Sequence, residues 1–318
     1  MCQLFWALKG SKFPTPVQSF QDFRPTYYLR VTKSYFQTYK IRENPRNPWI
    51  TKNQKNKVMW KWYDAQIVDI QQQSPTTRLF TLRANEPIGF KAGQFVTMDL
   101  PISDKRLKRW RSYSIANAPK VENALEKSEN TEGVINGISE GVSELEFSIV
   151  KATESTGGSY YLFEEAAVGT AIRFKGPDGA FTLRDASADK DLVFICTGTG
   201  VAPFRSMIWD IYKRQLPHRN IHLIFGGRQE HDILFREEFE FLEKNLPNFH
   251  FDAALSREPN WKGHKGYVHG IYTEGYQNVR PDVHFYICGW SKMIDDAVAK
   301  LIIDLGYDKS QVFYELYG

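Results

Sequence analysis

Four consecutive residues, Arg111, Ser112, Tyr113 and Ser114, combine a cation, an aromatic ring and two hydroxyl groups. On a β-strand, side chains two residues apart point to the same face. We therefore expect Arg111 and Tyr113 side by side and the two serines on the other face, with Ser114 back within reach of the same ligand if the strand ends or bulges there. A cation next to an aromatic ring suits a flat ligand that carries phosphate.

A second group of residues is suited to hold phosphate through its backbone. Gly157, Gly158 and Ser159 come directly before a short predicted helix at residues 160–166. Glycine lets backbone N–H groups approach a ligand closely, and the N-terminus of a helix favours negative charge. Taken alone, the pattern predicts only a turn, and we treat it as a candidate pyrophosphate site.

The strongest single motif is the glycine-rich turn at residues 197–203. It follows an apolar run at residues 191–196, which is typical of a buried strand. The motif opens a predicted helix, and Pro203 lies near its first turn, where a missing N–H costs nothing. A strand, a glycine-rich turn and a helix in this order predict a nucleotide site, although Pro203 replaces the third glycine of the usual fingerprint. The turn contains Thr197, Gly198, Thr199, Gly200, Val201, Ala202 and Pro203.

Two more turns, Gly226-Gly227-Arg228 and Cys288-Gly289-Trp290, also end predicted strands. Ligands of open α/β sheets bind at the carboxyl ends of the strands, so we expect these turns to converge. After the predicted strand at 249–255, Ser256 and Arg257 are candidates to bind the 2′-phosphate of NADPH. Further candidates are Lys265, as a second cation, and Tyr267, as a stacking ring; the alternative is a charged surface loop.

The chain shows two different patterns of predicted secondary structure, and each pattern positions some of these motifs. Closely spaced β-rich runs separated by turn residues predict a sandwich or barrel over residues 61–187, with a last short strand at 181–183 and a long polar loop at 119–143. Strands that alternate with helices predict a parallel sheet, covered on both faces, over residues 188–318. We expect strands at 191–196, 221–225, 249–255 and 283–288, and helices at 201–214, 232–245 and 291–305.

Composition narrows the class of protein. With 318 residues, 42% hydrophobic and 25% charged, the chain is long enough for two globular domains. Residues 1–62 contain 12 Lys or Arg and 2 Asp or Glu, a net charge of +10, whereas the remainder has a net charge of −6. We assign no fold to this basic extension, residues 1–60. Such a segment binds nucleic acid, anionic lipid or an acidic protein, or is a solvated tail.

Several classes are excluded. The three cysteines have no CxxC spacing and cannot supply the four thiolates of an iron–sulfur cluster. The seven histidines show no paired ligand spacing, so we predict no metal site and interpret them as structural or surface residues. No apolar run is long enough to cross a membrane, no signal peptide is evident, and we expect a cytoplasmic protein without specific nucleic-acid binding. The oligomeric state is left open, a monomer included.

Together and in this order, the motifs resemble the ferredoxin–NADP reductase superfamily over residues 60–318. The resemblance implies an α+β two-domain fold, in which a six-stranded antiparallel β-barrel that binds flavin precedes an α/β parallel-sheet domain that binds the nicotinamide nucleotide. The motifs are Arg111-x-Tyr113-Ser114, Gly157-Gly-Ser159, Gly198-Thr-Gly-Val-Ala-Pro-Phe204, Cys288-Gly289 and Glu315-Leu-Tyr317.

The resemblance also implies roles for single residues. Tyr113 packs on the flavin ring, Ser114 lies near its N5 atom, and Arg111 binds the pyrophosphate with the backbone around Gly158 and Ser159. Cys288 approaches the nicotinamide, and Gly289 lies beside it. Glu315 and Tyr317 resemble the Glu-x-Tyr end of plant-type reductases, whose terminal aromatic ring covers the flavin. Here one more residue, Gly318, follows.

The function predicted from this resemblance is an NAD(P)H-dependent flavin reductase. FAD is favoured over FMN, NADPH over NADH, and the electron acceptor is a separate carrier such as ferredoxin or flavodoxin. Five cations at residues 105–111 are a candidate docking surface for an acidic carrier. One alternative is an NADH-dependent reductase component of an oxygenase or cytochrome system. Another is a regulatory subunit that binds nucleotide without turnover.

Overall fold

The computed structural model describes residues 61–120, 141–152 and 157–317, with only the backbone of Tyr317. The basic extension at 1–60 and most of the predicted loop at 119–143 lie outside these ranges. By their contacts, residues 59–318 form one compact unit.

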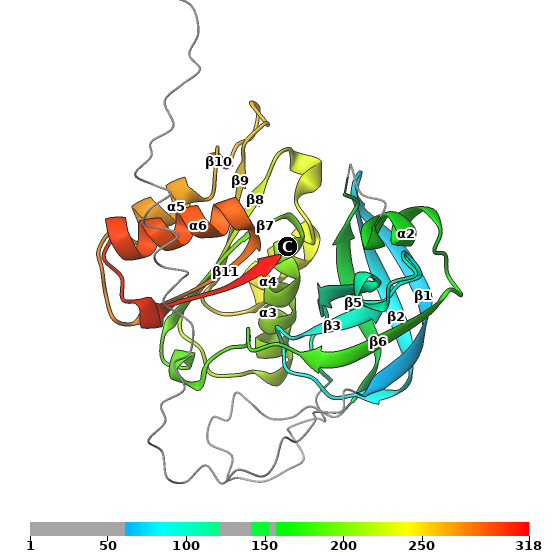
Figure 1. Cartoon of the computed structure of the whole chain (residues 1–318). Helices are drawn as coiled ribbons and strands as arrows, with labels where there is room; N and C mark the ends of the chain where they lie inside the picture. Colours follow the sequence, from blue (N-terminus) through cyan, green and yellow to red (C-terminus); the bar gives the residue numbers. More distant parts are fainter. Residues whose placement is uncertain (1–60, 121–140, 153–156, 318) are drawn as a thin grey trace, which may run out of the picture. The chain divides into compact units, whose positions relative to one another are not determined.

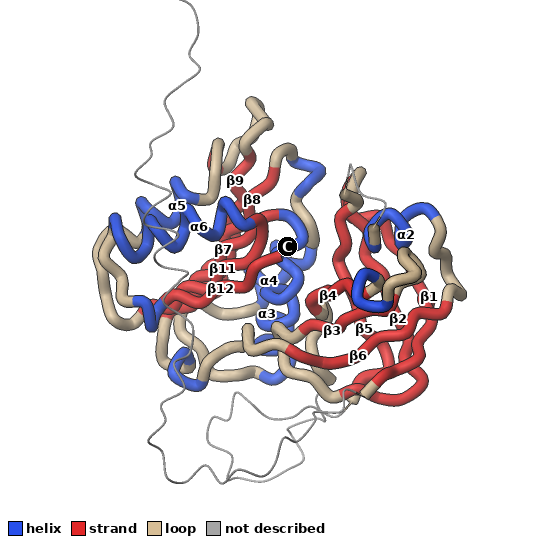
Figure 2. Tube along the Cα trace, in the orientation of Figure 1, coloured by secondary structure: helices blue, strands red, loops and turns tan. Residues whose placement is uncertain are grey.

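The first sheet is antiparallel throughout, with strand order β4-β3-β6-β1-β2-β5 (Figures 1 and 2). Its inward-facing side chains and those of helix α2 (Gly158–Glu164) form one buried cluster. The six strands are β1 (Trp62–Ser74), β2 (Thr77–Ile88), β3 (Phe95–Asp99), β4 (Trp110–Ser114), β5 (Val142–Val150) and β6 (Ala171–Asp178).

The two end strands of this sheet meet, which confirms the predicted six-stranded antiparallel barrel. Directly after β4, the backbone N–H of Ala116 donates to the carbonyl of Glu146 in β5 at 2.8 Å. The Asn117 amide then donates to the carbonyl of Glu144 at 3.0 Å and accepts from the N–H of Glu146 at 2.9 Å. These bonds satisfy backbone groups that an open sheet edge would expose.

Two local predictions in the barrel are wrong. One of the turn residues expected to separate the β-rich runs, Pro87, lies inside β2, because the register with β5 slips between Arg83 and Ile88 and a proline is tolerated at such an irregularity. The predicted strand at 181–183 is irregular chain. Its apolar side chains, Phe181 and Leu183, are buried against helix α3 (Ala202–Arg214) rather than in a ladder, so their alternation reflects packing and not pairing.

The second sheet is parallel throughout, with strand order β10-β9-β8-β7-β11-β12. The predicted change from antiparallel to parallel pairing falls between β6 and β7. Strands β10 and β12, which end the sheet, were not predicted. The six strands are β7 (Asp191–Thr197), β8 (Ile221–Gly227), β9 (Phe249–Leu255), β10 (His264–Lys265), β11 (Val283–Trp290) and β12 (Val312–Tyr317).

Helices cover both faces of the second sheet, as predicted (Figures 1 and 2). Along β7, Phe194 and Cys196 join the buried cluster of α3 and α4, whereas Val193 and Ile195 join that of α5 and α6. This alternation explains the continuous apolar run of the strand. The helices are α3 (Ala202–Arg214), α4 (Arg236–Asn245), α5 (His269–Gly275) and α6 (Ser291–Ala299), which continues as a π-helix over Lys300–Asp304.

Helix α4 begins later than predicted. The predicted helix at 232–245 is divided into a 3-10 turn, η5 (Glu230–Asp232), and α4, because Phe235 adopts a left-handed backbone with φ of +56°. Helix α5 was not predicted, because its seven residues are too few to show helical periodicity. Among the described residues, no helix is long and apolar enough to cross a membrane.

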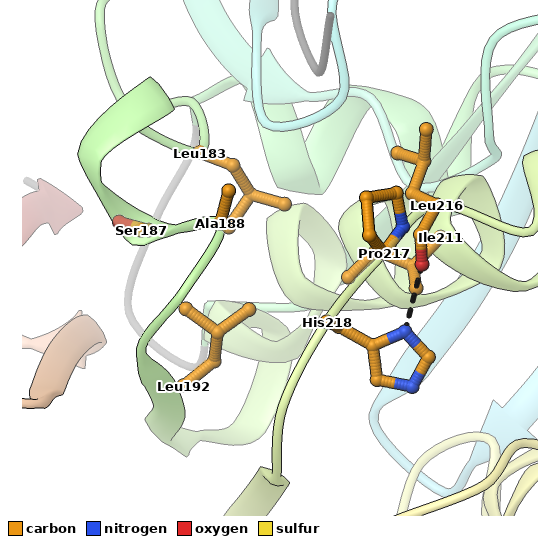
Figure 3. Close-up of a pocket in the computed structure, with 8 residues that line it drawn as sticks. All are labelled: Leu183, Ser187, Ala188, Leu192, Ile211, Leu216, Pro217 and His218. Atoms are coloured by element: carbon orange, nitrogen blue, oxygen red, sulfur yellow. Dashed lines mark hydrogen bonds between the residues drawn. The ribbon is translucent and has the colours of Figure 1, made fainter. Parts of the chain in front are cut away.

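A small cavity lies where the chain passes from the barrel to the second sheet (Figure 3). It holds about 10 Å³, about the space of one water molecule. His218 closes one side and bonds the carbonyl of Leu216 through Nδ1 at 2.8 Å. The cavity is too small for a cofactor, and it is lined by Leu183, Ser187, Ala188, Leu192, Ile211, Leu216, Pro217 and His218.

Candidate functional site

The structure brings together three of the residues predicted to hold a planar phosphate ligand. In the β3–β4 ladder, Tyr113 pairs with Val96 and Arg111 pairs with Met98, so Arg111 and Tyr113 share one face. Gly158, at the start of α2, lies against both: a Cβ on it would lie 2.6 Å from Arg111 Cγ and 3.0 Å from the Tyr113 hydroxyl. The glycine is needed for this close approach.

The polar groups of this cradle are suited to a phosphate and a ring. Arg111 donates from Nη1 to the carbonyls of Lys108, at 3.0 Å, and Trp110, at 2.8 Å. Its other guanidinium N–H groups form no hydrogen bond within the described part of the chain, so they can donate to an anion. Burial raises the pKa of Tyr113 above its ordinary value, and the positive charge of Arg111 opposes this shift only in part. The phenol therefore stays neutral.

Ser114 points away from this cradle and meets the end of the chain. Its hydroxyl donates to Oε2 of Glu315 at 3.4 Å, which joins β4 to β12 across 201 residues of sequence. Burial raises the pKa of Glu315 to about 7, and the hydrogen bond from Ser114 opposes that shift. Glu315 is therefore a carboxyl group that gains or loses a proton near neutral pH.

Cys288 lies next to this pair. In the β11–β12 ladder its partner is Glu315, so the two side chains share a face, and Cys288 is fully buried. Ser114, Cys288 and Glu315, which were predicted as catalytic from separate motifs, are thus brought together. Tyr317 lies two residues farther along β12, but its side chain and Gly318 lie outside the described part of the chain.

The two glycine turns at the carboxyl ends of β7 and β11 are in backbone contact. A Cβ on Gly200 would lie 2.4 Å from the carbonyl oxygen of Cys288, and one on Gly289 would lie 2.4 Å from Thr197 Oγ1. Gly198 adopts φ of +52° with nothing within 4 Å of its missing Cβ, so it faces open space. Gly200 and Gly289 thus fit the two strands together, and Gly198 leaves room for a ligand.

The motif at residues 197–203 has the predicted local structure. Thr197 ends β7, and a short 3-10 turn, η4 (Gly198–Val201), leads into α3 with Pro203 in its first turn. Thr199 lies within η4 and is partly exposed, whereas Pro203 is buried. A backbone turn of this kind at the carboxyl end of a parallel strand is suited to a dinucleotide phosphate.

Cations gather where β8, β9 and β10 end. The N–H of Arg257 donates to the carbonyl of Arg228 at 2.8 Å, and that of Ser256 to Gly227 at 3.1 Å. Lys265 pairs with the last residue of β9. Arg228, Arg257 and Lys265 are exposed and, within the described ranges, form no ion pair with a carboxylate. They are therefore available to a phosphate group. Tyr267, the predicted stacking ring, lies two residues after the end of β10 and is 73% exposed.

Arg205 was not predicted. From α3, its Nη1 donates to the carbonyl of Ala116 at 3.0 Å and pairs with Glu146 at 2.5 Å, while its Nε bonds Glu238 at 2.7 Å. The side chain is only 11% exposed. It links the segment that follows Ser114 to the helix that follows the nucleotide turn. The only signal in the sequence is a cation inside an apolar helical stretch, residues 201–208.

This donor set fits a flavin nucleotide. Gly158, the guanidinium N–H groups of Arg111 and the ring of Tyr113 form one cradle, in which a Cβ added to Gly158 would lie within 3.0 Å of the side chains of Arg111 and Tyr113. The buried hydroxyl of Ser114 lies at the far end of the same strand. A chain that used this strand only for packing would have no reason to keep a glycine and an available guanidinium there.

The chain is similar in sequence to known oxidoreductases. The family described as "Oxidoreductase NAD-binding domain" matches residues 194–299. The chain is 30% identical over 263 residues to "Ferredoxin--NADP reductase B" of Sorangium cellulosum, a match that covers 80% of this chain and 97% of that protein. It is also 30% identical over 243 residues to the "Phenol hydroxylase P5 protein" of Acinetobacter pittii. That match covers 76% of this chain, but the chain spans only 61% of the length of that relative.

Solved structures share the fold. The cytochrome P450 reductase GcoB of Amycolatopsis matches with a TM-score of 0.67 and 24% identity, over 81% of this chain and 70% of that chain. A ferredoxin NADP+ reductase of Neisseria gonorrhoeae, solved with bound FAD and NADP, matches with a TM-score of 0.64 and 23% identity, over 80% of this chain and 98% of that chain.

Proposed function

The chain belongs to the ferredoxin–NADP reductase family, and from this premise we propose that it is a FAD-dependent NAD(P)H oxidoreductase that passes electrons to a separate one-electron carrier. The observation that carries the proposal is the contact between Ser114 Oγ and Glu315 Oε2, with Cys288 in register beside Glu315. It joins the end of the barrel strand to the carboxyl ends of the parallel strands, where a nucleotide binds.

In this proposal the barrel holds the flavin. Arg111 and the backbone around Gly157, Gly158 and Ser159 bind the pyrophosphate, and Tyr113 packs on the ring. When bound, flavin accepts two electrons as hydride from a nicotinamide and releases them one at a time. FAD is proposed rather than FMN because the chain ends like the plant-type reductases.

The carboxyl ends of the parallel sheet hold the nicotinamide nucleotide. The turn at residues 197–203 binds its pyrophosphate, and Gly289 leaves room beside it. Arg228, Ser256, Arg257, Lys265 and Tyr267 form the adenosine end. NADPH is proposed rather than NADH because three exposed cations stand there without carboxylate partners in the described ranges, and a 2′-phosphate needs such cations.

Two buried residues, Ser114 and Cys288, and the half-buried Glu315 then act where the two halves meet. Glu315 holds or releases a proton near neutral pH, and it fixes the Ser114 rotamer. When Glu315 is protonated, it donates to Ser114 Oγ, and the single hydroxyl proton of Ser114 is then available to donate to the reacting edge of the ring. The small side chain of Cys288 permits close approach of the nicotinamide. We propose that Tyr317 covers the flavin until the nicotinamide displaces it.

The carrier docks beside the flavin strand. The 3-10 turn η1 (Arg106–Lys108) directly precedes it, and Lys105, Arg106, Lys108 and the 75% exposed Leu107 face solvent there. Arg109, in contrast, pairs through Nε with Asp99 at 2.8 Å. A cationic surface around one apolar side chain suits an acidic partner, and its charges mainly increase the association rate. Ferredoxin and flavodoxin are the proposed carriers.

A second candidate is a reductase component of an oxygenase. Relatives named for that role, the phenol hydroxylase P5 protein and "Phenol 2-monooxygenase, reductase component DmpP" of a Pseudomonas strain, are 30% and 32% identical to this chain. The chain spans 61% and 59% of their lengths, so their complete activity is not transferred.

The test is anaerobic reduction of the purified protein by NADPH and NADH in turn, after the released flavin has been identified. We expect bound FAD, faster reduction by NADPH, and single-electron transfer to ferredoxin or flavodoxin that weakens as salt increases. A colourless protein that oxidises neither nucleotide would refute the proposal. Reduction by NADH with transfer only to an oxygenase component would favour the second candidate.

A further inference from the structure

Three histidines surround one carboxylate at the end of the second sheet where β8, β9 and β10 lie side by side (Figure 1). Asp252 Oδ2 lies 3.0 Å from Nε2 of His222 and 3.2 Å from Nε2 of His250. Its other oxygen, Oδ1, lies 3.3 Å from Nε2 of His264. The ligand atoms of His222, His250 and Asp252 all lie within 4.8 Å of one another.

The strands position this cluster. His222 of β8 pairs with His250 of β9, and Asp252 is two residues farther along β9, so all three side chains share one face of the sheet. His264 of β10 pairs with Ala254, the next residue on that face. His222 and Asp252 are 16% and 21% exposed, whereas His250 is 60% exposed, so the cluster has a closed inner side and an open outer side.

In His222 and His250, the ring nitrogen that faces away from Asp252, Nδ1, has a partner of its own. His222 Nδ1 lies 2.9 Å from the hydroxyl of Tyr276, and His250 Nδ1 lies 2.7 Å from Oε1 of Glu243. This leaves Nε2 of each ring for the shared centre. A histidine whose second nitrogen is held by a carboxylate, hydroxyl or carbonyl is the usual arrangement around a protein-bound metal ion.

The Glu243 carboxylate fixes the orientation of the His250 ring. Its Oε1 accepts from the backbone N–H of Phe251 at 3.0 Å and lies 2.7 Å from Nδ1 of His250. The other ring nitrogen of His250, Nε2, lies 3.2 Å from Asp252 Oδ2, so the two atoms are placed to share one ion.

We propose that His222 Nε2, His250 Nε2 and Asp252 Oδ2 bind a divalent transition metal ion of the zinc class, and that His264 orients the carboxylate through Oδ1. In a tetrahedral zinc site, bonds of about 2.0–2.1 Å place neighbouring ligand atoms about 3.3 Å apart. The two His–Asp distances, 3.0 and 3.2 Å, are close to that spacing. Imidazole and carboxylate ligands suit zinc better than calcium or magnesium.

The site differs from the proposed nucleotide site in position and effect. His222 is the second residue of β8, whose carboxyl end is Gly227, five residues or about 16 Å away along the strand. The ion would link β8 to β9, and His264 directly precedes Lys265. Metal binding would therefore stabilise the short edge strand β10 and the loop that follows it, with no direct part in electron transfer.

The test is Zn²⁺ binding by the full chain, measured by calorimetry after chelator treatment, with any affinity tag removed. We expect one ion per chain and a higher unfolding temperature in Zn²⁺. Replacing a ligand, by His250→Gln or Asp252→Asn, should abolish this binding. Glu243→Gln and His264→Gln should weaken it about 10–100-fold, as expected for residues that orient ligands.

The matched control is His231→Gln, since His231 is also a half-exposed histidine of the same domain but lies in η5, away from the cluster. It should bind Zn²⁺ as the original chain does. His250 is exposed, so the loss of its imidazole should leave the fold intact, and circular dichroism checks this. The proposal is overturned if the chain binds no stoichiometric Zn²⁺, or if His250→Gln and His231→Gln bind it equally well. Both readouts are independent of flavin reduction.

Discussion

Glu315→Gln tests the electrostatics of the site through the pH dependence of stability. The carboxyl is half-buried beside Ser114, and this burial raises its pKa from 4.5 to about 7. Glutamine keeps the shape and can still accept the hydrogen bond from Ser114, but it cannot ionise. The substitution therefore removes one titrating group while the packing at the end of β12 is preserved.

The direction in which the free energy of unfolding changes with pH follows from the protons that Glu315 binds in the folded and unfolded chains. Between about pH 4.5 and about pH 7, the folded chain holds a proton on Glu315 that the unfolded chain has lost. The free energy of unfolding therefore falls as pH rises through this window, and the loss is complete above the folded pKa. A shift from 4.5 to about 7 corresponds to about 3 kcal/mol at 1.36 kcal/mol per pKa unit. Solvent near this partly exposed carboxyl reduces that figure.

The assay is urea unfolding at about pH 5 and about pH 8, with Glu274→Gln as the control because Glu274 is an exposed glutamate on α5. We expect Glu315→Gln to match the original chain at the lower pH and to be more stable at the higher pH by up to about 3 kcal/mol. Ser114→Ala should extend the upper end of the window to higher pH, since the hydrogen bond from Ser114 lowers the pKa of Glu315 in the folded chain only. Equal pH dependence in the original chain and in Glu315→Gln would refute the reasoning.

Three further substitutions test the contacts around the site. Arg205→Ala should lower the free energy of unfolding by about 3–5 kcal/mol in denaturant titrations, because it leaves two carboxylates unpaired, and Arg205→Lys should recover only part. Arg257→Ala should raise the KM for NADPH about 10–100-fold in steady-state assays and leave that for NADH unchanged, and equal effects on both would contradict a phosphate contact. Gly200→Ala should weaken nucleotide binding in fluorescence titrations, because its Cβ would lie 2.4 Å from the Cys288 carbonyl, whereas Gly270→Ala, with open space around it, should bind normally.

Sequence patterns were sufficient where one local rule decides the structure. The apolar run of β7 and the turn that follows it specify a buried strand and a glycine-rich turn into a helix without knowledge of the rest of the chain. The alternation of Arg111 and Tyr113 on β4 placed both side chains on one face, and the cradle against Gly158 agrees with that. Such features depend on neighbours within a few residues, which a sequence displays.

Contacts between distant segments could not be predicted in this way. Arg205 binds partners 33, 59 and 89 residues away, and its role depends on how the barrel meets α3. The contact of Ser114 with Glu315 spans 201 residues. The histidines were interpreted as structural or surface residues because ligands for one ion were sought at short spacing, whereas His222 and His250 are brought together only by strand pairing. The strand predicted at 181–183 was wrong for a different reason. Phe181 and Leu183 alternate because both pack against α3, and this gives the same apolar pattern as a strand.

The most direct test of the proposed function is the rate of flavin reduction by NADPH in anaerobic rapid mixing, comparing Ser114→Ala with Ser112→Ala. Both serines lie on β4, but Ser114 is buried against Glu315, whereas Ser112 is exposed and bonds Thr97 at 3.1 Å. We expect Ser114→Ala to reduce flavin about 10²-fold more slowly, as for loss of one preorganised donor, with normal FAD content, and Ser112→Ala to react normally. Equal rates in the two variants would contradict the account.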